Sequence, residues 1–201
     1  MIAVVKYNAG NIQSVLFALE RLGTEAIWTD DPEQLRRADR VIFPGVGEAS
    51  SAMHYLRERG LDTVLRSLRQ PVLGICLGLQ LFCRHSEEQD TDCLGIFDLA
   101  VRRFPAPAAA AADPLKVPHM GWNKLLDLKG PLFTGIEEGE FVYFVHSFYA
   151  EPSPEAVATT DYGRPFSAAL QRDNFYAVQF HPEKSGLAGQ RILQNFLEIG
   201  L

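Results

Sequence analysis

Along the first half of the chain, short apolar runs alternate with segments whose apolar positions recur with a helical period. The apolar runs are "IAVVKY", "AIWT", "RVIFPG" and "PVLGIC", each short enough to be one buried strand. Residues 11–22, 50–59 and 61–69 read as helices, and Gly23 closes the first of them. A further helical pattern, "LGLQLFCRH", follows the last of these strands directly. Strands separated by helices favour βαβ units and a parallel sheet.

The second half of the chain consists mainly of strand-like pieces divided by turns. These pieces are "GWNKLL", "EFVYFVHSFYA", "AVATTDY", "FSAALQRD" and "FYAVQFH", and a last helix is expected over about residues 189–197. The low-complexity stretch "PAPAAAAADP" (105–114) is expected to be an exposed loop. We therefore expect an α/β fold in one domain, residues 1–201. Its open, mostly parallel sheet would be flanked by helices and extended by antiparallel strands from the second half.

Composition and charge exclude several classes of protein. Hydrophobic residues make up 47% and charged residues 22% of the 201 residues, as in an ordinary globular protein with a real core. The net charge is −6 without a basic cluster, which argues against nucleic acid or a membrane surface as the main partner. We see no signal peptide and no run of about 18 apolar residues. Three cysteines are too few for a disulfide framework, so a reducing cytoplasm is expected.

Candidate chemistry begins at "GICLG", where Cys76 lies between Gly74 and Gly78 at the end of an apolar strand. A nucleophile between small residues at a strand-to-helix corner is typical of a nucleophile elbow. The N-terminus of the following helix would favour the thiolate, and the Leu77 N–H could bind the oxyanion of a tetrahedral intermediate. The alternative is a buried structural cysteine, since free cysteine usually behaves as a small hydrophobe.

A cysteine nucleophile needs a base, and the chain has five histidines. His54 and His85 lie in polar surroundings that indicate the surface. His181 ends the apolar strand "YAVQF" and is followed by "PE", so it should lie at the rim of the sheet, where open α/β sheets place their sites. Glu183, two residues on, could hold the imidazole tautomer. Together the two motifs favour catalysis over a chance ion pair at a strand end.

A metal site is the other chemistry that this region could hold. Cys76, Cys83, His85 and Cys93 cluster in the sequence, but the close C-x-x-C pairs of structural zinc are missing. We therefore expect no metal ion.

At this point the chain resembles the class I (triad) glutamine amidotransferases. "GICLGLQ" with "FHPE" downstream is specific for this class, and the resemblance covers essentially the whole chain, from "YNAGNIQSV" to "QFHPEKS". "PGVG" (44–47), "PHMGWN" (118–123) and "YFVHS" (143–147) resemble, within the class, the glutaminase subunits of imidazole glycerol phosphate synthase.

The resemblance implies a role for each matching residue. Cys76 would be the nucleophile, His181 the general base and acid, and Glu183 the residue that orients His181. Leu77 with Gly45, Val46 and Gly47 would form the oxyanion hole, and Gln80, Glu88, Ser147 and Phe148 would bind glutamine. The residues that would face a partner subunit are Trp122, Tyr143, His146 and Lys184. Without the resemblance, His146 could be a hydrogen-bonded histidine of the core, and Trp122 could be an ordinary core residue. Glu88 lies in "CRHSEEQDTDC", which departs from the family pattern.

The implied activity is hydrolysis of glutamine to glutamate and ammonia, without a metal or organic cofactor. The ammonia would pass to a cyclase partner, a (β/α)8 barrel, which forms imidazole glycerol phosphate and aminoimidazole carboxamide ribotide in histidine biosynthesis. The nearest alternative is the glutaminase subunit of another complex, such as pyridoxal phosphate synthase. A non-catalytic scaffold would have no need of all three triad residues, and a cysteine peptidase would not need Gln80 or the partner-facing motifs.

Overall fold

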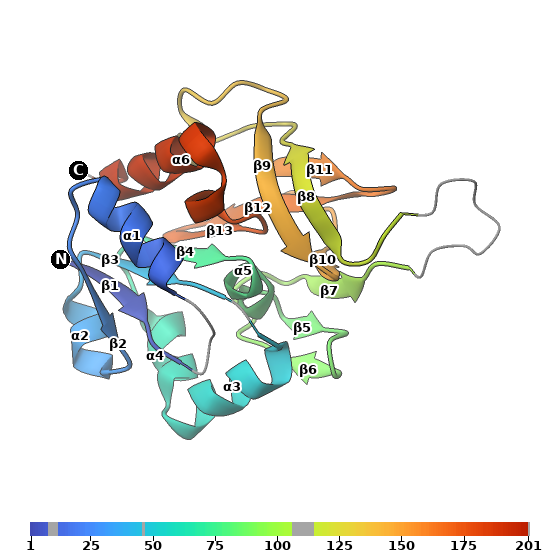
Figure 1. Ribbon diagram of the computed structural model, residues 1–201. Coiled ribbons are helices and arrows are strands. Elements are labelled where there is room, and N and C mark those ends of the chain that lie inside the picture. The colour runs from blue at the N-terminus through green and yellow to red at the C-terminus, as the bar shows by residue number, and fades with distance from the viewer. Residues whose placement is uncertain (8–11, 46, 106–114, 201) are drawn as a thin grey trace.

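A seven-stranded sheet forms the centre of the molecule (Figure 1). The structure is a computed structural model that describes residues 1–7, 12–45, 47–105 and 115–200. The strand order is β11-β12-β13-β4-β3-β1-β2. The parallel strands are β1 (Ile2–Val5), β2 (Ala26–Thr29), β3 (Arg40–Phe43), β4 (Val72–Ile75) and β13 (Phe175–Val178). The antiparallel strands β12 (Pro165–Arg172) and β11 (Ala156–Asp161) extend one edge.

Helices cover both faces of this sheet, because alternate residues of each buried strand point to opposite sides. Val4 packs with α1 (Gln13–Arg21) and α6 (Gly186–Glu198), which lie together above the sheet in Figure 1. Val5 packs with the other cluster, to which α2 (Pro32–Arg37), α3 (Ala49–Glu58) and α4 (Leu61–Ser67) contribute. Both residues are fully buried. In the described part of the chain, no helix has the length and apolar character needed to cross a bilayer.

Two smaller β-structures lie beyond the carboxyl ends of β4 and β13. One sheet has the order β10-β7-β5-β6 and contains β5 (His85–Ser86), β6 (Thr91–Asp92), β7 (Ala100–Arg103) and β10 (Phe148–Ala150). The other is an antiparallel ribbon of β8 (His119–Lys124) and β9 (Phe141–His146). The remaining elements are α5 (Leu77–Phe82) and the 3-10 turns η1 (Pro131–Phe133) and η2 (Pro182–Lys184).

The alternation of strands and helices in the first half is confirmed, and so is the α/β fold with added antiparallel strands. The pattern did not indicate α2, although Asp31 caps it by accepting a hydrogen bond of 2.8 Å from the Glu33 N–H, and Pro32 takes its first position. The expected helix over "LGLQLFCRH" ends at Phe82, because the chain turns away to pair β5 with β7. The last helix begins at Gly186 instead of residue 189.

The stretch "EFVYFVHSFYA" also differs from the expectation, because it is two strands instead of one. β9 pairs with β8, and after Ser147 the chain changes sheet, so that β10 pairs with β7. β5, β6 and β7 were not expected. β5 and β6 have two residues each and pair with each other across a short turn, and β7 pairs with β5 and with the distant β10. Residues 106–114 of the expected exposed loop lie outside the described residues.

Gly74 and Gly78 allow α5 to pack directly on β3 and β4. A Cβ atom on Gly78 would overlap the backbone carbonyl oxygen of Phe43, the last residue of β3. A Cβ on Gly74 would lie 2.7 Å from the Phe82 ring and 2.9 Å from the Gly78 carbonyl carbon. The two glycines flanking Cys76 are therefore needed for close packing of backbone on backbone.

A buried histidine pair joins the β8–β9 ribbon to β10. His146 Nδ1 lies 2.7 Å from the Phe148 carbonyl oxygen, which can only accept, so this nitrogen carries the proton. His146 Nε2 then accepts from His119 Nδ1 at 3.0 Å. His119 also stacks between Tyr162 and Phe144, with ring centroids 3.9 and 4.8 Å away. The pair is thus held neutral within an aromatic cluster.

We predict that Gly78→Ala destabilises the fold more than Gly23→Ala. Gly23 has a φ of +69° and open space around its Cα, so alanine there adds only left-handed strain of about 1 kcal/mol. At Gly78 the added methyl group meets a backbone carbonyl that cannot move alone, and overpacking of this kind costs about 3 kcal/mol. Urea unfolding followed by circular dichroism measures the free energy of unfolding of both variants. Equal losses of stability would contradict the close contact at Gly78.

We also predict that the histidine pair makes the fold sensitive to acid. Burial lowers the pKa of His119 to about 4, and burial likewise lowers that of His146 to about 3 against the opposing bond to the Phe148 carbonyl. The unfolded chain takes up protons near pH 6.5, which the folded chain does not. The pair's contribution to the free energy of unfolding is therefore complete above about pH 6.5 and falls as the pH drops towards 4.

The measurement compares urea unfolding of three chains between pH 7.5 and 4.5. His119→Gln removes one buried titrating ring while it retains an N–H donor, so its stability should fall less steeply than that of the wild type. His54→Gln is the matched control, because the His54 side chain is 75% exposed, and it should keep the wild-type slope. An unchanged slope in His119→Gln would show that the pair is not held neutral.

Candidate active site

Cys76 occupies a strained turn between β4 and α5. Its φ is +53° and its ψ is −107°, a conformation that costs a non-glycine residue about 1–3 kcal/mol. Its N–H still continues the sheet by donating to the Val178 carbonyl at 2.8 Å, and its carbonyl accepts from the Gln80 N–H at 3.3 Å. The turn therefore reverses the chain within one residue and presents the thiol at the carboxyl edge of the parallel strands. This geometry is that of a nucleophile elbow.

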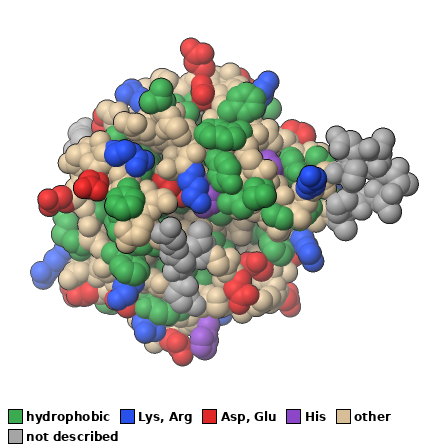
Figure 2. All heavy atoms as spheres, in the orientation of Figure 1, with side chains coloured by type: hydrophobic (Ala, Val, Ile, Leu, Met, Phe, Trp, Pro, Cys, Tyr) green, Lys and Arg blue, Asp and Glu red, His purple; other side chains and the backbone are tan. Residues whose placement is uncertain are grey.

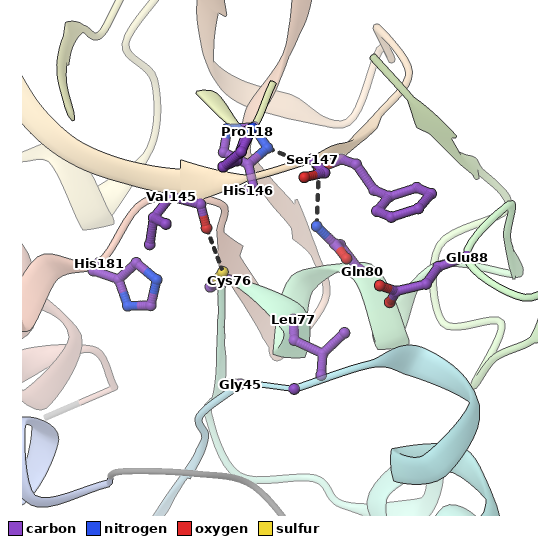
Figure 3. Close-up of a pocket in the computed structure, with 12 residues that line it drawn as sticks. Gly45, Cys76, Leu77, Gln80, Glu88, Pro118, Val145, His146, Ser147 and His181 are labelled. Atoms are coloured by element: carbon purple, nitrogen blue, oxygen red, sulfur yellow. Dashed lines mark hydrogen bonds between the residues drawn. The ribbon is translucent and has the colours of Figure 1, made fainter. Parts of the chain in front are cut away.

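His181 and Glu183 form the second part of the site. His181 Nδ1 lies 2.8 Å from Glu183 Oε1, and the two side chains are only 3% and 5% exposed. The 3-10 turn η2, which starts at Pro182, brings the carboxylate back to the ring. His181 Nε2 is buried and has no hydrogen-bond partner among the described residues. Figure 3 shows this ring beside the sulfur of Cys76.

Ser185 fixes the position of that turn. Its hydroxyl donates to the His181 carbonyl at 2.6 Å and accepts from the Tyr143 N–H at 2.9 Å. The His181 N–H donates in turn to the Tyr143 carbonyl at 2.9 Å. The backbone of the histidine is thereby tied to β9, and its ring has little freedom to leave the sulfur.

The charges around His181 favour its protonated form. Burial by itself lowers the pKa of His181, but the charge on Cys76 and the carboxylate of Glu183 outweigh it and raise the pKa above its usual range. The arrangement therefore suits a thiolate beside an imidazolium, as in other cysteine nucleophiles activated by histidine.

A cavity of about 340 Å³ opens at Cys76 (Figure 3). It is lined by most of the residues that the sequence analysis assigned to the nucleophile, the base, the oxyanion hole and the substrate: Gly45, Gly47, Cys76, Leu77, Gln80, Glu88, Ser147, Phe148 and His181. Glu183 lies behind His181, and Val46 lies outside the described residues. The volume is that of a small-molecule site. The substrate and oxyanion roles of these residues stay predictions.

Glu88 contributes to the cavity and to the end of a helix at the same time. Its Oε2 accepts from the Ala49 N–H at 2.8 Å, at the first residue of α3. Burial raises the pKa of Glu88, and the Ala49 hydrogen bond opposes that change. A second acidic group nearby, Glu48, raises the pKa further. The carboxyl group therefore has both a structural partner and a face towards the cavity.

The four residues expected at a partner interface divide into two groups. Trp122 and Lys184 are exposed, and the half-buried Tyr143 meets Trp122 edge to face with ring centroids 6.1 Å apart. His146 differs, because it is 5% exposed and lies in the aromatic cluster described above. His146 is thus buried, as in the core alternative, and it also lines the cavity, whereas the exposed Trp122 is not plain core. The partner contacts of all four residues stay predictions.

The other two cysteines do not compete as nucleophiles. Burial raises the pKa of Cys83 far above its usual range and that of Cys93 to about 12. Cys76, Cys83, His85 and Cys93 are close in the sequence. Within the described ranges, no group of three histidine, cysteine or acidic residues is placed to hold a metal ion. His85 instead lies 3.2 Å from the carboxylates of Asp90 and Asp92.

Sequence reasoning missed Gln179, whose side chain is fully buried 3.7 Å from the Cys76 sulfur. The available signal was one polar residue inside the apolar strand "YAVQF", two positions before His181. It also missed the Val145 carbonyl, 3.9 Å from the same sulfur (Figure 3). A backbone carbonyl leaves no mark in the sequence.

Comparison with known proteins agrees with this geometry. A family model described as Glutamine amidotransferase class-I matches residues 4–199. The imidazole glycerol phosphate synthase subunit HisH of Bacteroides fragilis (strain YCH46) is 62% identical over 198 residues, which cover 98% of this chain and 99% of that protein. The protein of the same name from Escherichia coli (strain K12) is 45% identical, with 98% of this chain and 99% of that protein covered.

Two solved structures share the fold. A putative GMP synthase subunit from Thermoplasma acidophilum superposes with a TM-score of 0.75 at 19% identity, covering 99% of this chain and 93% of that chain. A crystal structure of a glutamine amidotransferase gives a TM-score of 0.73 at 21% identity, with 98% of each chain covered. With the family model matching nearly every residue, the chain belongs to the class-I glutamine amidotransferases.

Proposed function

We propose that this chain is the glutaminase subunit of an imidazole glycerol phosphate synthase, and that it hydrolyses glutamine to glutamate and ammonia. The observation that carries the proposal is the Cys76–His181–Glu183 arrangement at a small cavity, in a chain 62% identical along its length to a HisH subunit. We further propose that residues 1–201 form one domain and act in the cytoplasm, to which three unpaired thiols are suited.

The proposed chemistry is acyl transfer through a thioester. The thiolate of Cys76 attacks the side-chain amide carbon of glutamine, and the Leu77 N–H with the segment around Gly45 and Gly47 binds the resulting oxyanion. His181 gives its proton to the leaving nitrogen, which departs as ammonia. Water, deprotonated by the same ring, then cleaves the thioester and releases glutamate.

The hydrogen bonds around Gln80 indicate how it would meet the substrate. Its Nε2 donates to the Phe148 carbonyl at 2.9 Å and to Gln179 Oε1 at 3.1 Å, which occupies both of its N–H groups. Only its Oε1 remains for a ligand, and oxygen accepts. Gln80 would therefore accept from the α-ammonium group of glutamine, with Glu88 supplying the opposite charge.

Exposed apolar side chains beside the cavity support a partner subunit. Met120, Trp122 and Phe141 are 66%, 55% and 47% exposed on the ribbon of β8 and β9, and Figure 2 shows hydrophobic side chains gathered over this ribbon. Apolar patches of this kind are typical of protein–protein contacts. We propose that the ribbon, with Lys184 nearby, docks on a cyclase subunit with a (β/α)8 barrel, which receives the ammonia. Histidine biosynthesis is the pathway that this pairing implies.

The glutaminase subunit of a different complex, such as pyridoxal phosphate synthase, is less well supported. Its only argument is the shared triad, whereas the relatives at 62% and 45% identity are full-length matches named as HisH. The bent backbone at Cys76 and the buried histidine also count against an inactive scaffold, since neither benefits the stability of the fold.

We predict that Cys76→Ala lowers glutamine hydrolysis to less than about one thousandth of the wild-type rate, since no other thiol can replace the nucleophile. Mixed with the cyclase partner, the variant should still form product when ammonium salt replaces glutamine, because the cyclase chemistry occurs on the other chain. Glutamate release and product formation are measured separately. A wild-type rate of glutamine hydrolysis in Cys76→Ala would refute the assignment of Cys76 as the nucleophile. Loss of the ammonium-dependent reaction would indicate a damaged complex.

We predict that Trp122→Ala weakens docking of the partner by about 2 kcal/mol, roughly a 30-fold rise in Kd, as for a central aromatic side chain. Glutaminase of the isolated chain should change little. Trp28→Ala is the matched control, because Trp28 is 46% exposed on β2 at one edge of the seven-stranded sheet, whereas Leu126, just after β8, pairs with β11 at the other edge. Titration of each chain with the cyclase subunit measures Kd. Equal effects of the two substitutions would show that the ribbon is not the interface.

A further inference from the structure

Gln179 is a fully buried polar side chain that takes no part in the proposed acyl transfer. It directly follows β13, and its N–H donates to the Ala168 carbonyl at 2.8 Å, so its backbone is fixed by the sheet. Its side chain lies between the reactive sulfur and Gln80, at 3.7 Å from Cys76 Sγ and 3.1 Å from Gln80 Nε2. A buried amide must have partners for both of its ends, and these two groups are its partners.

The direction of the Gln179 amide follows from a single backbone carbonyl. The Phe148 carbonyl can only accept, so the group of Gln80 that lies 2.9 Å from it is the NH2 group. That same NH2 group faces Gln179, which must then present its Oε1. The remaining end of Gln179, its NH2 group, therefore faces the sulfur of Cys76. A flipped Gln179 would place two NH2 groups against each other.

The sulfur consequently has one acceptor and one donor beside it. The Val145 carbonyl, 3.9 Å away, can accept from the thiol but opposes the thiolate with its lone pairs. The Gln179 N–H offers the thiolate what the carbonyl cannot, and hydrogen bonds to a charged group contribute about 1.5–3 kcal/mol. His181 supplies the proton transfer but comes from a different direction, from the turn after β13.

We propose that Gln179 is a further residue of the catalytic site, whose amide donates to the Cys76 sulfur and stabilises its thiolate. Its direction is set by Gln80, so the residue that would meet the substrate also orients the donor to the nucleophile. This inference rests on the proposed glutaminase function for its consequence in turnover. The hydrogen bond from Gln179 to the sulfur does not depend on that function, because it forms in the chain without any substrate.

The test measures how fast iodoacetamide alkylates Cys76 as a function of pH, in the full chain, with the modified residue identified by mass mapping. Gln179→Met keeps the size of the side chain and removes the donor. Gln179→Glu keeps the shape and the oxygen towards Gln80 but turns a second oxygen to the sulfur. The pH midpoint of alkylation should rise by about one unit in Gln179→Met and by more in Gln179→Glu.

A role in packing alone gives a different result. Both variants fill the same space, so wild-type midpoints in the two would overturn the proposal, as would a lowered midpoint in Gln179→Glu. Thermal unfolding of each variant monitors the fold. If neither variant folds, the wild-type chain still tests the proposal. The side-chain N–H signals of Gln179 in a nitrogen-15 spectrum should change with pH, with the same midpoint as the alkylation of Cys76. Signals that do not change at that midpoint would refute the hydrogen bond from Gln179.

Activity separates this inference from the proposed function. At pH values below the wild-type alkylation midpoint, glutamine hydrolysis by both variants should fall about 10-fold or more if the thiolate is the nucleophile. If the variants have raised alkylation midpoints but the wild-type chain hydrolyses no glutamine, Gln179 is still a donor to the sulfur, and the proposed glutaminase function is refuted. Normal wild-type glutaminase with unchanged midpoints would refute the donor alone.

Discussion

The strained backbone of Cys76 is the constraint on which the rest of the site depends. A φ of +53° is unfavourable for a residue with a side chain, and it persists because β3, β4 and α5 hold the turn from three sides. Because Gly78 has no Cβ atom, α5 packs directly on the Phe43 carbonyl at the end of β3. This packing determines where the sulfur lies, and every other group of the site is positioned relative to it.

Two elements outside the parallel sheet complete the site, and each is held by hydrogen bonds to its neighbours. Ser185 ties η2 to β9 and so keeps His181 beside the sulfur. The Phe148 carbonyl accepts from both His146 and Gln80, so the buried histidine pair and the amide of Gln80 share one anchor. The ribbon of β8 and β9 carries this pair, so the ribbon and Gln80 contact each other through the Phe148 carbonyl. The fold thereby connects the proposed docking surface to the nucleophile.

The sequence predicted the parts of the molecule whose causes are local. The short apolar strands, the glycines around Cys76 and the Pro–Glu pair after His181 each act within a few residues, and the structure has the elements that they indicate. What depends on distant pairing was missed: the pairing of β7 with β10, the change of sheet at Ser147, and Gln179 beside Cys76. The local hairpin of β5 and β6 was missed because each strand has only two residues. His146 shows the same limit, because a histidine on an alternating strand reads the same whether its ring faces a partner or an aromatic core.

The central claim is that the sulfur of Cys76 becomes covalently bonded to the substrate. The most direct measurement is mass spectrometry of the chain in complex with its cyclase partner, quenched in acid during turnover of glutamine. The account predicts one γ-glutamyl group on the peptide that contains Cys76, lost on treatment with hydroxylamine and missing from Cys76→Ala. Glutamate production with no adduct on Cys76 at any quench time, or an adduct on Cys83 or Cys93, would contradict it.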